Sequence, residues 1–217
     1  MPASASLLAL VTSAYSCYSS CRQYREDLAA AVDEVGPAAD GLVIDKVRPY
    51  SGHPGVGRAW RRALVAALSE LPEPASARIL YVTHSIPTAM DDTSGPGDGE
   101  GNLYVDQHVR LGRRLTDEVN AELGLDVEGE LVFCSRSGRP GQPWLEPDVN
   151  DRIEELAAEG GVSAVVVAPI GFVSDHMEVI YDLDTEARAT AERHGIALAR
   201  AATPGIDARF VAMIRHL

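Results

Sequence analysis

The segment SAVVVAPIGFVSDHMEVIYDLDTEA, residues 163–187, joins an apolar run to an acidic one. Its first part, residues 163–170, is rich in valine and shows no strict alternation of apolar and polar residues. Such a run is typical of a strand that is buried on both faces of a parallel sheet. The acidic part follows at the carboxyl end of this strand, which is where ligands bind in open α/β sheets.

Four more runs of the same kind are spread along the chain, with helical patterns between them. The expected strands cover residues 7–12, 42–47, 78–83 and 130–135. The expected helices cover residues 18–35, 54–70, 102–123, 148–159, 176–194 and 207–217. This alternation predicts an α/β fold built from βαβ units, with parallel sheets flanked by helices.

The Pro-rich segment LPEPAS, residues 71–76, is the best candidate for a domain boundary. We predict a first domain over 1–72, a second over 73–205, and a terminal helix over 206–217 that packs back on the first domain. The first domain holds only two of the expected strands, too few to cover the faces and edges of a sheet. We therefore expect half of that domain to be absent. The Gly-rich, acidic segment 93–102 predicts an exposed loop.

Composition excludes several classes of protein. The chain has 217 residues and a formal net charge of −13, which argues against a nucleic acid as partner because such binding needs Lys and Arg. No apolar run approaches the roughly 20 residues of a membrane span, and no basic region precedes the first apolar stretch. We expect a cytoplasmic protein. Its three cysteines, Cys17, Cys21 and Cys134, are expected to be thiols because their number is odd.

The acidic residues after the strand at 163–170 recur with helical spacing. Like charges at such spacing cost a helix about 0.2–0.5 kcal/mol per pair, so the stripe is either screened by water or holds cations or protons. Four acids share the stripe: Asp175, Glu178, Asp182 and Glu186. Four apolar residues are predicted to face the core on the opposite side: Met177, Ile180, Leu183 and Ala187.

A capping box is the alternative interpretation of the first two acids. Asp175 as N-cap and Glu178 three residues later would satisfy the first turn of a helix and suit its dipole. This leaves Asp182 and Glu186 without an explanation, and both interpretations remain open.

His84 directly follows the strand at 78–83 and joins the acidic group if the two strands share one sheet. A neutral imidazole near a carboxylate can accept a proton or bind an ion such as Fe(II). A single histidine at a strand end can equally be hydrogen-bonded in the core or solvated. The sequence contains no H-x-x-x-H, C-x-x-C or H-E-x-x-H spacing, so we expect a metal to be handled here rather than stored.

Four segments together resemble the ferrochelatase family, and specifically the actinobacterial coproporphyrin III ferrochelatases. They are SAYSCYSSCRQY (13–24), VTHSIPTAM (82–90), FCSRSGRPGQPWLEPDVND (133–151) and VVVAPIGFVSDHMEVIYDLDTEA (165–187). The resemblance runs from about Leu7 to Leu217. It implies a chelatase-like fold of two Rossmann-like lobes. The N-terminal lobe is incomplete, because a segment of about 100 residues that begins the family's chains is missing.

The resemblance also implies an activity, the insertion of Fe2+ as substrate into coproporphyrin III or a related porphyrin in haem biosynthesis. It implies no nucleotide cofactor, and partners limited to the porphyrin and proteins of the haem pathway. Some members hold a [2Fe–2S] cluster through three cysteines near the C-terminus; no cysteine follows Cys134, so no cluster is expected. The matched site residues are His84 at the iron, Glu178 facing it, Tyr24 on the porphyrin, and a proton or metal conduit of Asp175, His176 and Asp182.

Two alternatives stay open at this stage. The chain could be a half that binds tetrapyrrole or metal without turnover, or that needs a separate N-terminal chain. It could also be a cobalt or nickel chelatase of sirohydrochlorin, which shares this architecture. The WLEPD and GFVSDHMEVIYDLD motifs argue against the second alternative.

Overall fold

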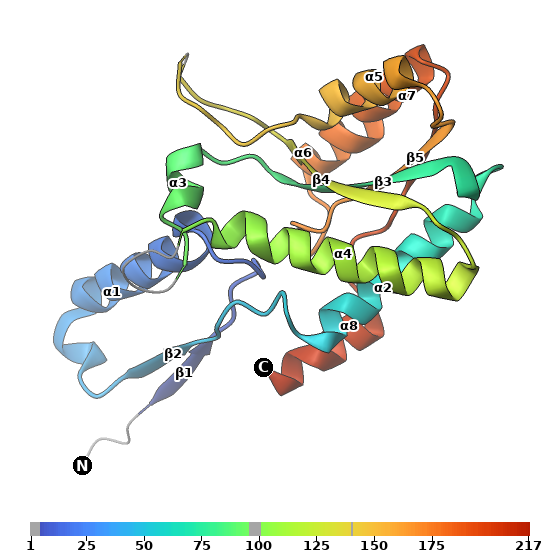
Figure 1. Cartoon of the computed structure of the whole chain (residues 1–217). Coiled ribbons are helices and arrows are strands. Elements are labelled where there is room, and N and C mark those ends of the chain that lie inside the picture. The colour runs from blue at the N-terminus through green and yellow to red at the C-terminus, as the bar shows by residue number, and fades with distance from the viewer. Residues whose placement is uncertain (1–4, 96–100, 140) are drawn as a thin grey trace.

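A computed structural model describes residues 5–95, 101–139 and 141–217, and it confirms the predicted α/β fold (Figure 1). A four-stranded parallel sheet has the order β4-β3-β5-β6, and a two-stranded parallel sheet pairs β1 with β2. The strands are β1 (Ser6–Ala9), β2 (Val43–Lys46), β3 (Ala77–His84), β4 (Glu128–Cys134), β5 (Ala164–Ala168) and β6 (Ala197–Arg200).

The helices follow the predicted segments closely. The α-helices are α1 (Gln23–Val35), α2 (Pro54–Ser69), α3 (Thr88–Asp92), α4 (Leu103–Leu123), α5 (Val149–Glu159), α6 (Met177–Val179), α7 (Arg188–Arg193) and α8 (Ala208–Met213). Two π-helical segments are η1 (Tyr18–Arg22) and η4 (Ile180–Ala187), and 3-10 turns are η2 (Gly36–Ala39), η3 (Pro74–Ser76) and η5 (Ile214–His216). Within the described ranges, no helix is long and apolar enough to span a membrane.

Two short elements were not predicted from the sequence. Strand β6 has four residues and helix α3 has five, so neither is long enough to show a hydrophobic period. The central part of the Gly-rich segment 93–102 lies outside the described residues.

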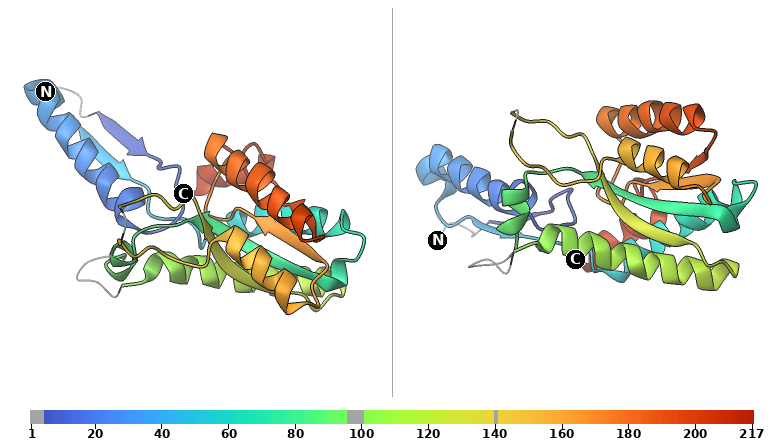
Figure 2. Two further views of the ribbon diagram at one scale, coloured as in Figure 1. Left: turned by 90° about the horizontal axis from the view of Figure 1, so that it is seen from above. Right: turned by 45° about the horizontal axis from the view of Figure 1, so that its top comes forward.

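The central strands divide their side chains between two layers of helices. In β3, Ile79 and Tyr81 pack into the cluster that contains α2 and α4, whereas Leu80 and Val82 pack into the cluster that contains α5 and α7. Both layers are visible on opposite sides of the sheet in Figure 2. Burial on both faces explains why these strands show continuous apolar runs rather than alternation.

Helix α2 connects the two predicted domains. It packs against α4, α8 and the strands β5 and β6 of the larger sheet, although it precedes the predicted boundary at residue 72. Its contact with α8 is close, because a Cβ on Gly55 would lie 2.6 Å from Cγ of Met213. The division at residue 72 remains a prediction, and the segments on either side of it share one hydrophobic cluster.

The two-stranded sheet is poorly covered by comparison. Helix α1 has no buried residue, and Leu8 and Val43 of the two strands are 67% and 49% exposed. The unit formed by β1, α1 and β2 extends away from the larger sheet in the left-hand view of Figure 2. Two strands rarely form a stable sheet without further strands or packing. The unit therefore presents an apolar surface and two strand edges that no other described strand pairs.

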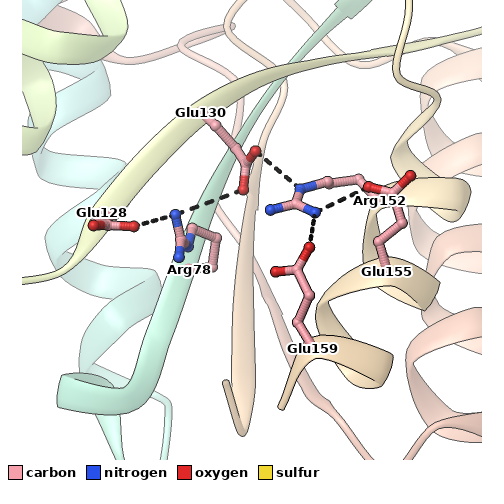
Figure 3. Close-up of polar contacts among 6 residues, drawn as sticks. All are labelled: Arg78, Glu128, Glu130, Arg152, Glu155 and Glu159. Atoms are coloured by element: carbon pink, nitrogen blue, oxygen red, sulfur yellow. Dashed lines mark hydrogen bonds and ion pairs between the residues drawn. The ribbon is translucent and has the colours of Figure 1, made fainter. Parts of the chain in front are cut away.

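A network of two arginines and four glutamates fastens α5 to the sheet (Figure 3). The Arg152 guanidinium donates to carboxylate oxygens of Glu130, Glu155 and Glu159, each at 2.9 Å. Arg78 on β3 pairs with Glu128 and lies 3.8 Å from an oxygen of Glu130. The side chain of Arg152 is only 14% exposed, so three carboxylates depend on one mostly buried cation.

Replacing Arg152 with Ala should lower the free energy of unfolding by about 2 kcal/mol, because Glu130 is left partly buried without its main partner. Urea denaturation of both proteins measures the difference. The matched control is Arg110→Ala, which breaks an exposed i,i+4 pair with Asp106 and should cost less than about 0.5 kcal/mol. Equal effects of the two substitutions would contradict this role for Arg152.

Candidate active site

The carboxyl ends of β3 and β5 meet at a cleft of about 570 Å³. This volume lies within the roughly 300–1,000 Å³ of small-molecule sites. One wall comes from residues 12–24, which follow β1 and end in the first turn of α1, and the other from the segments after β3 and β5. The cleft thus lies between the two sheets, at the edge where ligands of parallel α/β proteins bind.

A close approach of two strand ends shapes the cleft floor. Gly171, just after β5, donates its N–H to the carbonyl of Val82 at 3.1 Å. A Cβ at this position would lie 2.0 Å from Oγ1 of Thr83, which is shorter than any real contact. Only glycine fits here, and its absence of a side chain brings the segment after β5 against the end of β3.

His84 ends β3 and lines the cleft. Its Nδ1 is hydrogen-bonded to the carbonyl oxygen of Ser85. Because a carbonyl can only accept, Nδ1 carries a proton in this geometry, and Nε2 presents a lone pair whenever the ring has a single proton. The imidazole is therefore oriented to take up a proton or a metal ion at Nε2.

Glu178 faces this lone pair. Its Oε1 lies 3.7 Å from Nε2 of His84, with both side chains partly exposed. Two acceptors at this separation repel unless a proton or a metal ion lies between them. Among the described residues, no group of three or more His, Cys, Asp or Glu side chains could hold a metal ion.

A π-helical segment follows directly behind Glu178. It places Leu183 and Ala187 in the core, and together with Val179 at the end of α6 these fully buried residues follow steps of four. The predicted core face was wrong at two positions, because Met177 is 78% and Ile180 42% exposed. The i→i+5 bonds of a π-helix widen the turn, so the buried face follows a step of four rather than 3.6 residues.

The predicted capping box was also wrong. His176, not Asp175, is the N-cap, and its Nδ1 accepts from the N–H of Val179 at 3.5 Å. The carboxylate of Asp175 instead accepts from Arg200 on β6 at 2.8 Å, and Asp184 binds the same guanidinium at 2.9 Å. This arginine, which the sequence did not single out, neutralises two of the clustered acids.

The other two predicted conduit residues, His176 and Asp182, make different contacts. His176 lines the cleft and packs edge-on against Phe172. Asp182, four residues beyond Glu178, accepts a short hydrogen bond from the hydroxyl of Ser135 at the end of β4. Asp175, the third predicted member, is held in its ion pair with Arg200. The conduit itself remains a prediction.

Tyr24 lies on the opposite wall of the cleft, where residues 12–24 contribute mainly hydroxyl groups. No pattern in the sequence marks these small polar residues as part of a site. Three side chains on the C-terminal side were also not selected as site residues: Met90, Tyr104 and Trp144.

The cysteines are free thiols. Burial raises the pKa of Cys134 to about 12, so its thiol stays protonated at neutral pH although it lies next to Ser135. The prediction that no cluster is bound remains a prediction.

Two parallel sheets and a cleft at the carboxyl ends of the central strands define an α/β protein with a candidate ligand site at a sheet edge. The ferrochelatase family model matches residues 3–217. The chain belongs to the ferrochelatase family.

Curated relatives of similar sequence are named coproporphyrin III ferrochelatase. The protein from Streptomyces griseus is 51% identical over 215 residues, which is 96% of this chain and 56% of the relative. That from Streptomyces coelicolor is 50% identical, covering 97% of this chain and 57% of the relative. The chain therefore spans just over half the length of these relatives. A multi-domain protein from Deinococcus radiodurans, described as structurally similar to chelatases, matches 99% of this chain and 55% of its own with a TM-score of 0.46 and 14% identity.

Replacing Gly171 with Ala should lower the free energy of unfolding by about 1–3 kcal/mol, because the new methyl group would overlap Thr83. Thermal and urea denaturation measure this loss. Gly52→Ala is the matched control, since nothing lies within 4 Å of a Cβ at that position. If both variants are as stable as the parent protein, the close packing at the cleft floor is not as described.

Proposed function

We propose that this chain inserts ferrous iron into coproporphyrin III, with the cleft as the tetrapyrrole site. The observation that carries the proposal is the 3.7 Å separation between Nε2 of His84 and Oε1 of Glu178 beside the cleft. The names of the relatives support the choice of substrate.

The reaction replaces two pyrrole protons of the macrocycle with one Fe2+ ion, and no electrons are transferred. Nε2 of His84 has a free lone pair that can accept one proton, and the carboxylate of Glu178 can accept the other. Asp182 lies behind Glu178 and would pass a proton on toward solvent. The same acceptors would replace the water molecules that the iron ion loses as it enters the ring.

The lining of the cleft suits a flat ligand that carries carboxylates. Phe172, Trp144 and Tyr24 supply aromatic surface for the ring. None of the described lining residues is Lys or Arg, so the donors available to carboxylates are neutral groups such as the hydroxyls of Thr12, Ser13 and Ser19.

A second candidate function is favoured by the open two-stranded sheet. A chain of just over half the length of its relatives could bind tetrapyrrole or metal without turnover, or could act with a separate chain that completes the small sheet. The sirohydrochlorin alternative is tested in the same assays by offering that substrate with Co2+.

The proposed activity is tested by zinc insertion into coproporphyrin III, followed by the fluorescence of the product. His84→Ala should reduce the rate by about 100-fold or more, as expected for removal of a general base. His194→Ala is the matched control, because His194 pairs with Glu154 away from the cleft and should not change the rate.

Retained activity in His84→Ala would contradict the proposed role of this histidine. Coproporphyrin binding followed by absorbance, without turnover in the parent chain, would favour the second candidate function.

A further inference from the structure

Tyr104, in the first turn of α4, reaches the backbone of the proposed iron ligand. Its hydroxyl donates to the carbonyl oxygen of His84 at 2.9 Å. It also lies 2.6 Å from Oγ1 of Thr83, and since its single proton goes to the carbonyl, the threonine hydroxyl must donate to it. Tyr104 is 6% exposed, and burial raises its pKa, so the phenol stays protonated and remains a donor.

A second layer holds Tyr104 itself in place. Nδ1 of His108 donates to the carbonyl of Tyr104 at 2.7 Å, and the two rings meet edge to face with centroids 4.5 Å apart. His108 is fully buried, and burial lowers its pKa to about 3, so the ring is neutral across the physiological range. Its Nε2 has no hydrogen-bond partner among the described residues.

The stack continues into the N-terminal part of the chain. The ring of Tyr15 lies parallel to that of His108, with centroids 3.5 Å apart and an interplanar angle of 13°. The hydroxyl of Tyr15 donates to the carbonyl of Ile170, just after β5, at 2.7 Å. Tyr15, His108 and Tyr104 therefore form a buried aromatic cluster that bonds the ends of both central strands.

The bonds around His84 leave its peptide little freedom. Its carbonyl oxygen accepts from the hydroxyl of Tyr104. The next residue, Ser85, donates its N–H to the carbonyl of Cys134 and its hydroxyl to the carbonyl of Leu145, both at 2.8 Å. The imidazole in turn bonds the carbonyl of Ser85. A shift of this peptide would therefore move Nε2 relative to Glu178.

We propose that Tyr104 is a positioning residue for His84, and that the stack of Tyr15 on His108 keeps Tyr104 in place from the N-terminal part of the chain. The inference rests on the proposed function of His84 as a metal ligand. Small displacements of a reacting group reduce rates by as much as about 100-fold, so loss of one fixing bond should be measurable.

The test uses Zn2+ alone and measures its affinity by titration calorimetry, which does not depend on turnover. Tyr104→Phe removes only the hydroxyl and should weaken Zn2+ binding about 10-fold. Tyr81→Phe is the matched control, because Tyr81 is equally buried on β3 and its hydroxyl bonds Thr116, outside the cleft. Its Zn2+ affinity should equal that of the parent chain, and the melting temperatures of the two variants should be similar.

The variant His84→Ala distinguishes the proposed metal site from the proposed positioning role of Tyr104. Loss of Zn2+ binding in His84→Ala together with parental affinity in Tyr104→Phe would overturn the positioning role alone. Unchanged binding in His84→Ala would overturn the proposed metal site and the positioning role with it. Should Tyr104→Phe fail to fold, Thr83→Val removes the other hydroxyl of the same bond and should weaken binding in the same direction; parental affinity in that variant would overturn the proposal.

Discussion

Two hydrogen-bond acceptors face each other at the carboxyl edge of the larger sheet, and this opposition governs the rest of the site. The lone pair on Nε2 of His84 and the carboxylate of Glu178 lie 3.7 Å apart. Neither can donate to the other when the ring has a single proton and that proton is on Nδ1, so a further proton or a metal ion would be needed to bridge them. Parallel strands, the approach at Gly171 and the π-helical segment behind Glu178 all serve to bring these two side chains together.

The two sheets differ in how well they are covered by the rest of the chain. The larger sheet is covered on both faces and is fastened to α5 through Arg152. The small sheet of β1 and β2 has exposed apolar side chains and a helix with no buried residue. Tyr15 nevertheless extends from the segment after β1 into the core beside His108. The small sheet is thus connected, through Tyr15, to the residues that contact the backbone of His84.

The sequence predicted the fold well because burial on both faces leaves a clear record in the central strands. It also led to His84 and Glu178, through the rule for strand ends and the resemblance to ferrochelatases. Its errors have local physical causes. Ile180 was assigned to the core because a period of 3.6 residues was assumed where the helix has a wider turn. The capping-box interpretation of Asp175 is wrong because its partner, Arg200, lies 25 residues away on a strand too short to recognise. The contacts of Tyr104 and His108 depend on packing between distant segments, which no local pattern records.

The tautomer of His84 is the most direct test of the acceptor pair. Nitrogen-15 NMR of the chain labelled at histidine, with His84→Ala to assign the signals, distinguishes a protonated ring nitrogen from one with a lone pair. We expect a protonated Nδ1, a free Nε2, and a change in the Nε2 signal on addition of Zn2+. A proton on Nε2, or a His84 signal that Zn2+ leaves unchanged, would contradict this expectation.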